Sequence, residues 1–317
     1  MHTMPVDEGM MKFYKALQAK TPPEAVDWPL DRQRREWDAV CREFRAPVPR
    51  GVHIEDRDVS GVHIRIFRPE GDGLKPGFIY FHGGGWVLGS IETHHDMCAE
   101  MAAEADVVTV AVDYRLAPEH PHPAQMEDAL TVLNWMRRDG AMAGIDVARI
   151  CGGGDSAGGQ MTAGLALMLR DRGLPQLNGQ ILIYPVLGAD IATRSYTANA
   201  DAPCLTRTEM NYYLESFLGP RGGPNWSDPY AIPLLAKDLS KLPPAFITVA
   251  EHDPLHDDGV AYHERLLASG TRSLLRREPA LAHSYMRARN VSAPAMAGFR
   301  AITGALRSLA GEGELPG

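Results

Sequence analysis

The sequence predicts an α/β protein with a mostly parallel central sheet flanked by helices. Short apolar runs rich in Val and Ile suit strands that are buried on both faces. They cover residues 77–81, 107–112, 148–152, 180–186 and 245–250. Amphipathic helical patterns separate several of them, at residues 124–138, directly after Ser156 and at residues 258–269. Because strands that alternate with helices need crossover connections, this order favours parallel pairing with helices on both faces.

A hairpin precedes these runs. Residues 52–59 and 62–69 have strand-like composition and are separated only by Ser60 and Gly61. Two such runs joined by a two-residue turn predict an antiparallel pair at the start of the sheet.

Two regions break the strand–helix alternation. Residues 1–50 carry two stretches with apolar side chains at helical spacing, and residues 188–235 form a long insertion between two strands. The insertion holds a third helical face that includes Met210, Tyr213 and Phe217. Because an insertion of this length inside a compact fold commonly serves as a lid, we expect these regions to cover a site.

The composition excludes several classes of protein. Of the 317 residues, 44% are hydrophobic and 23% are charged, and the formal net charge is −8. Nucleic-acid binding needs clustered Lys and Arg, so no nucleic-acid partner is expected. The N-terminal segment lacks the regions of a secretory signal, and no stretch approaches the ~18 apolar residues that cross a bilayer. We therefore expect a cytoplasmic protein without a membrane span.

A Gly-x-Ser-x-Gly motif supplies the candidate nucleophile. Gly154, Ser156 and Gly158 stand between a strand-like run and an Ala- and Leu-rich helix. On such a sharp turn the serine oxygen projects above the sheet, and the positions two before and two after it must be small. Asp155 cannot reach the far side of a histidine ring from this turn, so we interpret it as structural.

A glycine-rich loop follows the strand at 77–81 and predicts an oxyanion hole. The loop reads His82-Gly83-Gly84-Gly85-Trp86. Glycines let backbone N–H groups approach a developing oxyanion, and losing one such donor lowers the rate by about 10²–10³. We assign the N–H groups of Gly83, Gly84 and Ala157 as donors, and His82 as a residue that orients the loop.

The acid and the base are expected after later strands. Asp253 follows the run at 245–250, and His283 comes in a context of small residues. The histidine would take the proton of Ser156, and the aspartate would orient the histidine. Asp257 and Asp258 are rival acids that we interpret as helix caps.

Other histidines and the cysteines have simpler interpretations. His252 and His256 have the i, i+4 spacing of a metal site, but no metal-binding signature surrounds them, so we expect no metal there. They, like His94 and His95, are interpreted as surface residues. The cysteines are expected to be reduced, without a disulfide framework or zinc site. They are Cys41, Cys98, Cys151 and Cys204.

Together these motifs resemble the hormone-sensitive-lipase family of esterases. The resemblance rests on HGGGW at 82–86, YRLAPE at 114–119, GDSAGG at 154–159 and DPLHDDG at 253–259. It implies an α/β-hydrolase fold with a catalytic domain over residues 51–317. It also implies a helical cap built from residues 1–50 and from the insertion at 188–235. In this family Arg115 and Glu119 form a supporting network, and a homodimer is compatible with family habit.

The resemblance implies a carboxylesterase for short- to medium-chain esters that needs no cofactor. Its triad would be Ser156, Asp253 and His283. The alternatives are an amidase or arylformamidase with the same triad, and a small-molecule receptor on a hydrolase scaffold. The receptors lack the catalytic histidine, which this chain has. The bulk of Trp86 near the oxyanion loop and the apolar cap faces suggest acyl chains of about C2 to C8.

The chain departs from the family pattern at two places. Gln160 stands where the family often has Asn, and the HPHPA segment at 120–124 replaces a more apolar Phe-Pro-Ala stretch. We expect these departures to affect substrate preference rather than the chemistry.

Overall fold

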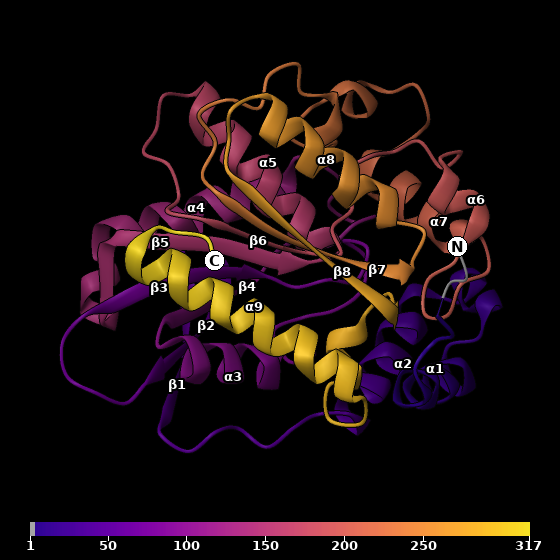
Figure 1. The fold of residues 1–317 in the computed structure, drawn as a ribbon, viewed down its shortest axis with the longest axis horizontal. Coiled ribbons are helices and arrows are strands. Elements are labelled where there is room, and N and C mark those ends of the chain that lie inside the picture. The colour runs from indigo at the N-terminus through magenta and orange to yellow at the C-terminus, as the bar shows by residue number, and fades with distance from the viewer. Residues whose placement is uncertain (1–3) are drawn as a thin grey trace.

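The computed structural model describes residues 4–317 and is built around one sheet (Figure 1). The strand order is β1-β2-β4-β3-β5-β6-β7-β8. The strands are β1 (Val52–Val59), β2 (Val62–Pro69), β3 (Lys75–Phe81), β4 (Val108–Asp113), β5 (Ile145–Asp155), β6 (Gln180–Ile183), β7 (Ala245–His252) and β8 (Ser273–Ala282). The β1–β2 and β2–β4 pairs are antiparallel, and all the others are parallel.

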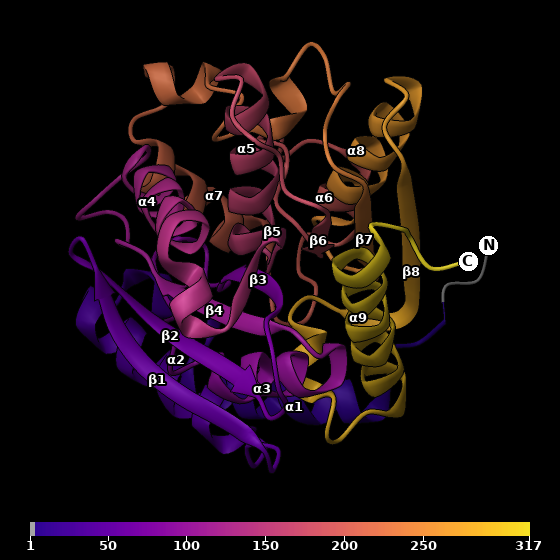
Figure 2. The ribbon, with the colours of Figure 1, turned by 90° about the vertical axis from the view of Figure 1, so that its left-hand side faces the viewer.

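Helices cover both faces of the sheet (Figures 1 and 2). One face carries α3 (His95–Ala105) and α9 (Ala293–Glu312). The other carries α4 (Ala124–Asp139), α5 (Ala157–Asp171) and α8 (His256–Ala268). Strands such as β4 and β6 are buried along their length, because both of their faces meet helices. None of the helices within residues 4–317 is long and apolar enough to cross a bilayer.

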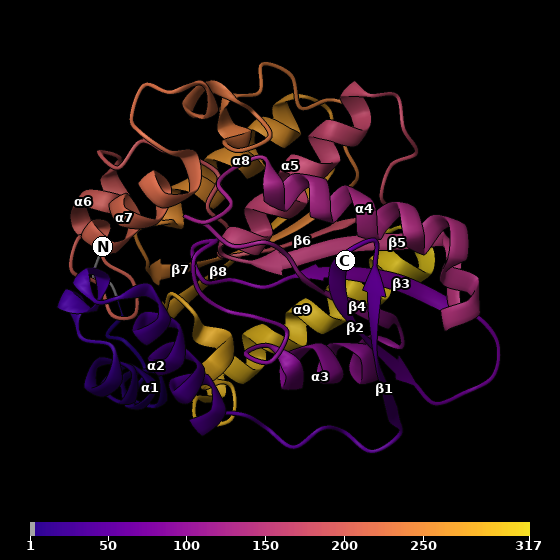
Figure 3. The ribbon, with the colours of Figure 1, turned by 180° about the vertical axis from the view of Figure 1, so that it is seen from behind.

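A second group of helices gathers at the end of the molecule towards which β7 and β8 point (Figures 1 and 3). It comprises α1 (Glu8–Lys20), α2 (Leu30–Glu43), α6 (Arg194–Ala198) and α7 (Arg207–Leu218). Short 3₁₀ turns complete the chain: η1 (Pro23–Asp27), η2 (Gly140–Ala143), η3 (Pro224–Ser227), η4 (Pro233–Leu235) and η5 (Tyr285–Ala288). The N-terminal helices and the insertion after β6 therefore meet at the carboxyl ends of the strands, where sites form in open α/β sheets.

The fold class predicted from the sequence is confirmed, and most of its elements are found. The hairpin and all five apolar runs form strands, and the three helical patterns form α4, α5 and α8. The strand β8 was not predicted. Its sequence, SLLRREPALA, mixes charged and apolar residues because it lies at the edge of the sheet and is only partly buried.

The N-terminal helices are tied to the loop after β3. The guanidinium of Arg34 on α2 donates to the Val87 carbonyl at 2.9 Å and pairs with Glu119 at 2.8 Å. Arg115 and Glu119, which were expected to form one supporting network, take part in separate contacts, since Arg115 binds Asp128. Glu119 is used to hold α2 against the core.

The carboxylates at the start of α8 hold the insertion after β6. Asp258 is buried, and one of its oxygens accepts from the N–H groups of Leu187 at 2.9 Å and Gly188 at 2.8 Å. Asp257 accepts from the Ser195 N–H at 2.8 Å, at the first turn of α6. The expectation that these residues cap their own helix is wrong, because their oxygens accept from backbone N–H groups that lie 62 to 71 residues earlier in the chain.

Candidate active site

Ser156 stands at the junction of β5 and α5 in a left-handed backbone conformation, with φ 55° and ψ −116°. L-residues rarely adopt this region, so the turn is strained and must be held by its surroundings. Side chains cannot be placed at Gly154 and Gly158, since a Cβ atom on either would collide with the Phe81 carbonyl oxygen. The Gly-x-Ser-x-Gly pattern is therefore a packing requirement of this turn against β3.

A continuous hydrogen-bonded chain runs from Ser156 to Asp253. The Oγ atom of Ser156 lies 3.0 Å from Nε2 of His283, and Nδ1 of His283 lies 2.7 Å from Oδ2 of Asp253. All three residues are buried. An ionised carboxylate only accepts hydrogen bonds, so Nδ1 carries the hydrogen and Nε2 is free to accept from the serine hydroxyl.

Neighbouring strands deliver the acid and the base. Asp253 follows β7 directly, and its second oxygen accepts from the Leu255 N–H at 2.9 Å. His283 follows β8, which pairs in parallel with β7. The structure brings together the three residues that the sequence singled out, and it does so through the strand that the sequence analysis missed.

The loop after β3 is fastened to the residue before the serine. The N–H of Gly83 donates to Oδ1 of Asp155 at 2.9 Å. An amide has one hydrogen, so this contact contradicts the expectation that Gly83 is an oxyanion donor. Among the described residues, the amides of Gly84 and Gly85 have no acceptor, and both residues have positive φ.

Asp155 is the centre of a buried polar network. Its Oδ1 atom also accepts from the Tyr80 hydroxyl at 2.7 Å and lies 3.2 Å from Nε2 of His94. An NH₂ group of the Arg287 guanidinium lies 2.8 Å from the same Nε2 atom of His94. Burial acts to raise the pKa of Asp155, but His94, Arg287 and Tyr80 outweigh it and hold that pKa well below its ordinary range.

This network corrects the interpretation of His94. It is fully buried rather than a surface residue, and burial lowers its pKa. Its position before a helix gave no indication of this, because the partner residues, Asp155 and Arg287, are 61 and 193 positions away. Asp155 is not part of the Ser156–His283–Asp253 chain, in keeping with the structural interpretation given to it.

His82 packs inside the same loop. Its ring stacks on Tyr114, with centroids 4.2 Å apart, and its Nδ1 atom lies 3.0 Å from the Gly83 carbonyl oxygen. Burial lowers the pKa of His82 to about 3. The ring is therefore neutral near pH 7, and its contacts are with the glycine-rich loop.

Trp86 lies beneath the loop and not in the cavity. Its ring is buried and stacks on Phe217 of α7, with centroids 4.0 Å apart. Its Nε1–H donates to Gln160 at 2.9 Å, and the Gln160 amide donates to the Tyr230 carbonyl at 2.7 Å. The departure at Gln160 thus joins the core to the insertion, and the bulk of Trp86 does not limit the substrate space directly.

The second departure makes a similar connection. Nε2 of His122 lies 2.8 Å from Oδ2 of Asp228, which belongs to the insertion. The His122 ring also packs edge-on against Phe217. A phenylalanine at this position could not make the polar contact with Asp228.

A cavity of about 1010 Å³, including its opening to solvent, lies above Ser156. Its floor contains Ser156, His283 and the glycines of the loop after β3. Side chains from α1, α2 and the insertion complete it: Tyr14, Leu17, Gln18, Thr21, Gln33, Trp37, Cys204, Leu205, Thr206, Glu209, Met210 and Tyr213. The regions expected to cover a site therefore contribute most of the wall.

Within residues 4–317, no group of three or more His, Cys, Asp or Glu side chains is arranged to hold a metal ion. His252 instead approaches the Met4 carbonyl, at 2.8 Å. His256 lies beside Asp257, with its Nδ1 atom 3.1 Å from the carboxylate.

Comparison with known proteins agrees with this geometry. A family model described as the alpha/beta hydrolase fold matches residues 78–287. Carboxylesterase NlhH of Mycobacterium tuberculosis is 42% identical over 246 residues, which are 74% of this chain and 76% of the relative. The ethyl acetate hydrolase of Pseudomonas putida is 33% identical and covers 81% of each chain. The crystal structure of a thermostable esterase from Pseudomonas putida superposes with a TM-score of 0.91 at 28% identity, over 98% of this chain and 99% of that one. This chain belongs to the alpha/beta hydrolase fold family, which confirms the resemblance drawn from its motifs.

Proposed function

We propose that this protein is a carboxylic ester hydrolase that works through an acyl-enzyme on Ser156. The observation that carries the proposal is the hydrogen-bonded chain Ser156–His283–Asp253 at the floor of a cavity. The relatives named above, a carboxylesterase and an ethyl acetate hydrolase, support the same class of reaction.

In the first half of the reaction, His283 takes the hydroxyl proton of Ser156 through Nε2 while Oγ attacks the ester carbonyl carbon. The tetrahedral intermediate then collapses. Its C–O bond to the alcohol breaks, and His283 gives the proton to the leaving alcohol oxygen. In the second half a water molecule repeats these steps on the acyl-enzyme and releases the acid. Asp253 holds the histidine in the required tautomer and stabilises the imidazolium.

The oxyanion donors that we propose are the N–H groups of Gly84, Gly85 and Ala157. Gly83 is replaced by Gly85 in this set because its own hydrogen is engaged by Asp155. Ala157 is the first residue of α5, so its N–H has no acceptor within the helix. The N-terminal end of this helix also favours negative charge.

We propose that residues 1–50 and 188–235 act as a cap over this site. Their side chains line the cavity, and the contacts of Arg34, Gln160 and Asp258 fasten them to the core. Short- to medium-chain esters are the proposed substrates, supported by the ethyl acetate hydrolase among the relatives.

The test is hydrolysis of p-nitrophenyl acetate, butyrate, octanoate and palmitate by the wild-type protein and by Ser156→Ala, beside the matching p-nitroanilides. We expect turnover of the short esters, slow or no turnover of the anilides, and none by the variant. A best rate on palmitate would overturn the chain-length proposal. Folded wild-type protein that cleaves the anilides but no ester would replace the esterase with an amidase.

A further inference from the structure

One carboxylate in the cavity is not used by the proposed reaction. Glu209 lies in the first turn of α7 and lines the same cavity as Ser156 and His283. Its Oε2 atom accepts from the Thr206 N–H at 2.7 Å and from the Thr206 hydroxyl at 2.8 Å. Its Oε1 atom has no donor among residues 4–317. This atom is also not among the fully buried polar side-chain atoms that lack a hydrogen-bond partner, so part of its surface remains accessible. One oxygen of Glu209 is therefore free to accept from a bound molecule.

The cavity wall around Glu209 holds no permanently charged cation. No Lys or Arg side chain lines the cavity, and Glu209 forms no ion pair within the described part of the chain. Burial raises the pKa of Glu209, while Thr206 and His283 oppose that shift. A poorly solvated carboxylate without a cation is unfavourable unless a partner arrives, so a positively charged group would gain from binding here.

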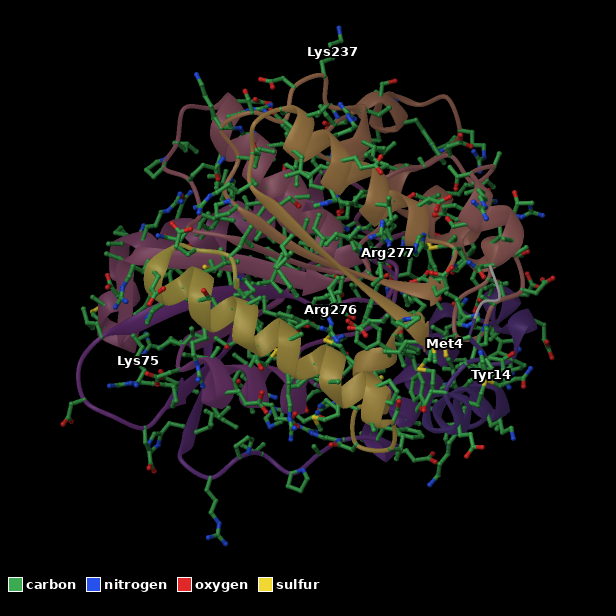
Figure 4. The ribbon with its side chains drawn as sticks, in the orientation of Figure 1. Met4, Tyr14, Lys75, Lys237, Arg276 and Arg277 are labelled. Atoms are coloured by element: carbon green, nitrogen blue, oxygen red, sulfur yellow. The ribbon has the colours of Figure 1, made fainter. Side chains whose placement is uncertain are left out.

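Aromatic rings line the same cavity. Tyr14 comes from α1, at the end of the molecule where α6 and α7 stand (Figure 4), and Trp37 and Tyr213 come from α2 and α7. Burial is the main cause of the raised pKa values of Tyr14 and Tyr213; the Glu209 charge adds to it at both, after Cys204 in the case of Tyr14. Carboxylate and aromatic faces around one space are a combination that attracts ammonium groups, through charge and through the ring quadrupoles.

We propose that Glu209 is a specificity residue that selects esters bearing a protonated amine. This inference rests on the proposed ester hydrolysis at Ser156 and adds the substrate class. The ammonium N–H donates to Oε1 of Glu209 while the ester carbonyl lies at Ser156. Anionic esters are disfavoured by the same carboxylate, with no cation in the cavity wall to receive them.

The competing role for Glu209 is purely structural, as the capping partner of Thr206 at the start of α7. The Glu209→Gln substitution distinguishes the capping role from the amine-binding role. In a capping box Gln replaces Glu, because its carbonyl oxygen accepts from the same N–H. The Glu209→Gln variant therefore keeps the cap, and it turns the free oxygen into an NH₂ group that repels an ammonium.

The experiment uses two esters of equal shape, 2-(dimethylamino)ethyl acetate, which is protonated at pH 7, and 3-methylbutyl acetate, which is neutral. Hydrolysis of each is followed in a pH-stat for the wild type and for Glu209→Gln. Any effect of Glu209 on His283 changes both rates alike, so the ratio of the two kcat/KM values isolates recognition of the amine. We expect the substitution to lower that ratio about 10- to 100-fold, mainly through KM, as for the loss of a charge-assisted hydrogen bond.

Glu215→Gln is the matched control, since Glu215 lies on the same helix and pairs with Arg221 outside the cavity. It should leave the ratio at the wild-type value. A ratio that stays within about twofold in Glu209→Gln overturns the proposal.

Failure of the proposed function would look different, because the wild type would then hydrolyse neither ester. In that case binding of the two esters to Ser156→Ala, with and without Glu209→Gln, is compared by calorimetry. Tighter binding of the amine that depends on Glu209 upholds the inference, and equal binding overturns it.

Discussion

The N–H of Gly83 donates to Oδ1 of Asp155, and this 2.9 Å contact joins the loop after β3 to the residue that precedes the nucleophile. The loop and the serine turn are therefore held in one arrangement, because the loop is hydrogen-bonded to the carboxylate of Asp155 and Ser156 is the next residue in the chain. Tyr80 and His94 contact that carboxylate from two further directions.

Removing the charge of Asp155 should weaken both the fold and the reaction. Asn keeps an acceptor for Gly83 but removes the negative charge that faces His94, which in turn contacts the buried Arg287. We expect Asp155→Asn to lose about 1–3 kcal/mol of unfolding free energy, as for a buried polar group whose hydrogen bonds are disturbed, and to lower kcat. Urea denaturation and p-nitrophenyl butyrate hydrolysis measure the two effects. Unchanged stability would mean that the network is not what holds the turn.

Asp253→Asn tests the acid of the proposed triad. The amide can present its NH₂ group to His283 and so favour the wrong tautomer. By analogy with serine proteases, kcat should fall by about 10⁴ with little change in KM. Asp257→Asn, which alters a carboxylate bonded to Ser195 instead, is the control and should retain near-wild-type kcat. A mild effect of Asp253→Asn would remove this residue from the mechanism.

Asp258 should make the folded protein less stable as the pH rises. Burial raises its pKa to about 7. The folded state then binds a proton more tightly than the unfolded chain, so the stability gained below about pH 4 is lost as the pH rises to 7. Asp258→Asn keeps the acceptor for Leu187 and Gly188 without the charge. Relative to the wild type, it should gain up to ~4 kcal/mol between pH 4 and pH 8 in denaturation experiments, at ~1.4 kcal/mol per pKa unit.

His82 should act in the opposite direction. Its pKa of about 3 in the folded protein lies below that of an unfolded histidine. The stability it contributes is complete above about pH 6.5 and is lost as the pH falls, by ~2 kcal/mol between pH 6.5 and pH 5. His82→Asn should flatten this part of the stability profile when unfolding is measured by urea at each pH. If the wild-type and variant profiles are parallel, His82 is not held neutral by burial.

The sequence predicts the parts of this molecule that depend on local pattern. Runs of Val and Ile predict the central strands, which are buried on both faces. Glycines two positions before and after Ser156 predict its sharp turn, because side chains there would collide with the Phe81 carbonyl. Such features depend on residues that are close together in the chain or on one tightly defined turn. The edge strand β8 was not predicted, because a half-exposed strand does not need an apolar sequence.

The contacts that were missed or misassigned join residues far apart in the chain. Nothing near His94 indicates a carboxylate at 155 or a guanidinium at 287. The loss of Gly83 as a donor depends on which way the Asp155 side chain turns. The role of Glu209 likewise requires knowing that α7 lies over Ser156, which the helical spacing of Met210 and Tyr213 alone does not contain.

The bond between the Asp7 N–H and the Ala280 carbonyl, at 2.9 Å, places α1 against β8. During synthesis, the segment that forms α1 leaves the ribosome well before β8 and His283, which follow much later in the chain. The wall of the cavity made by Tyr14 and Leu17 therefore lacks its contact with β8 until that strand has emerged. A growing chain, or a product of early termination, would hold the Ser156 turn but neither its base nor its enclosed cavity. The protein would thus be inert until β8 and His283 have been made.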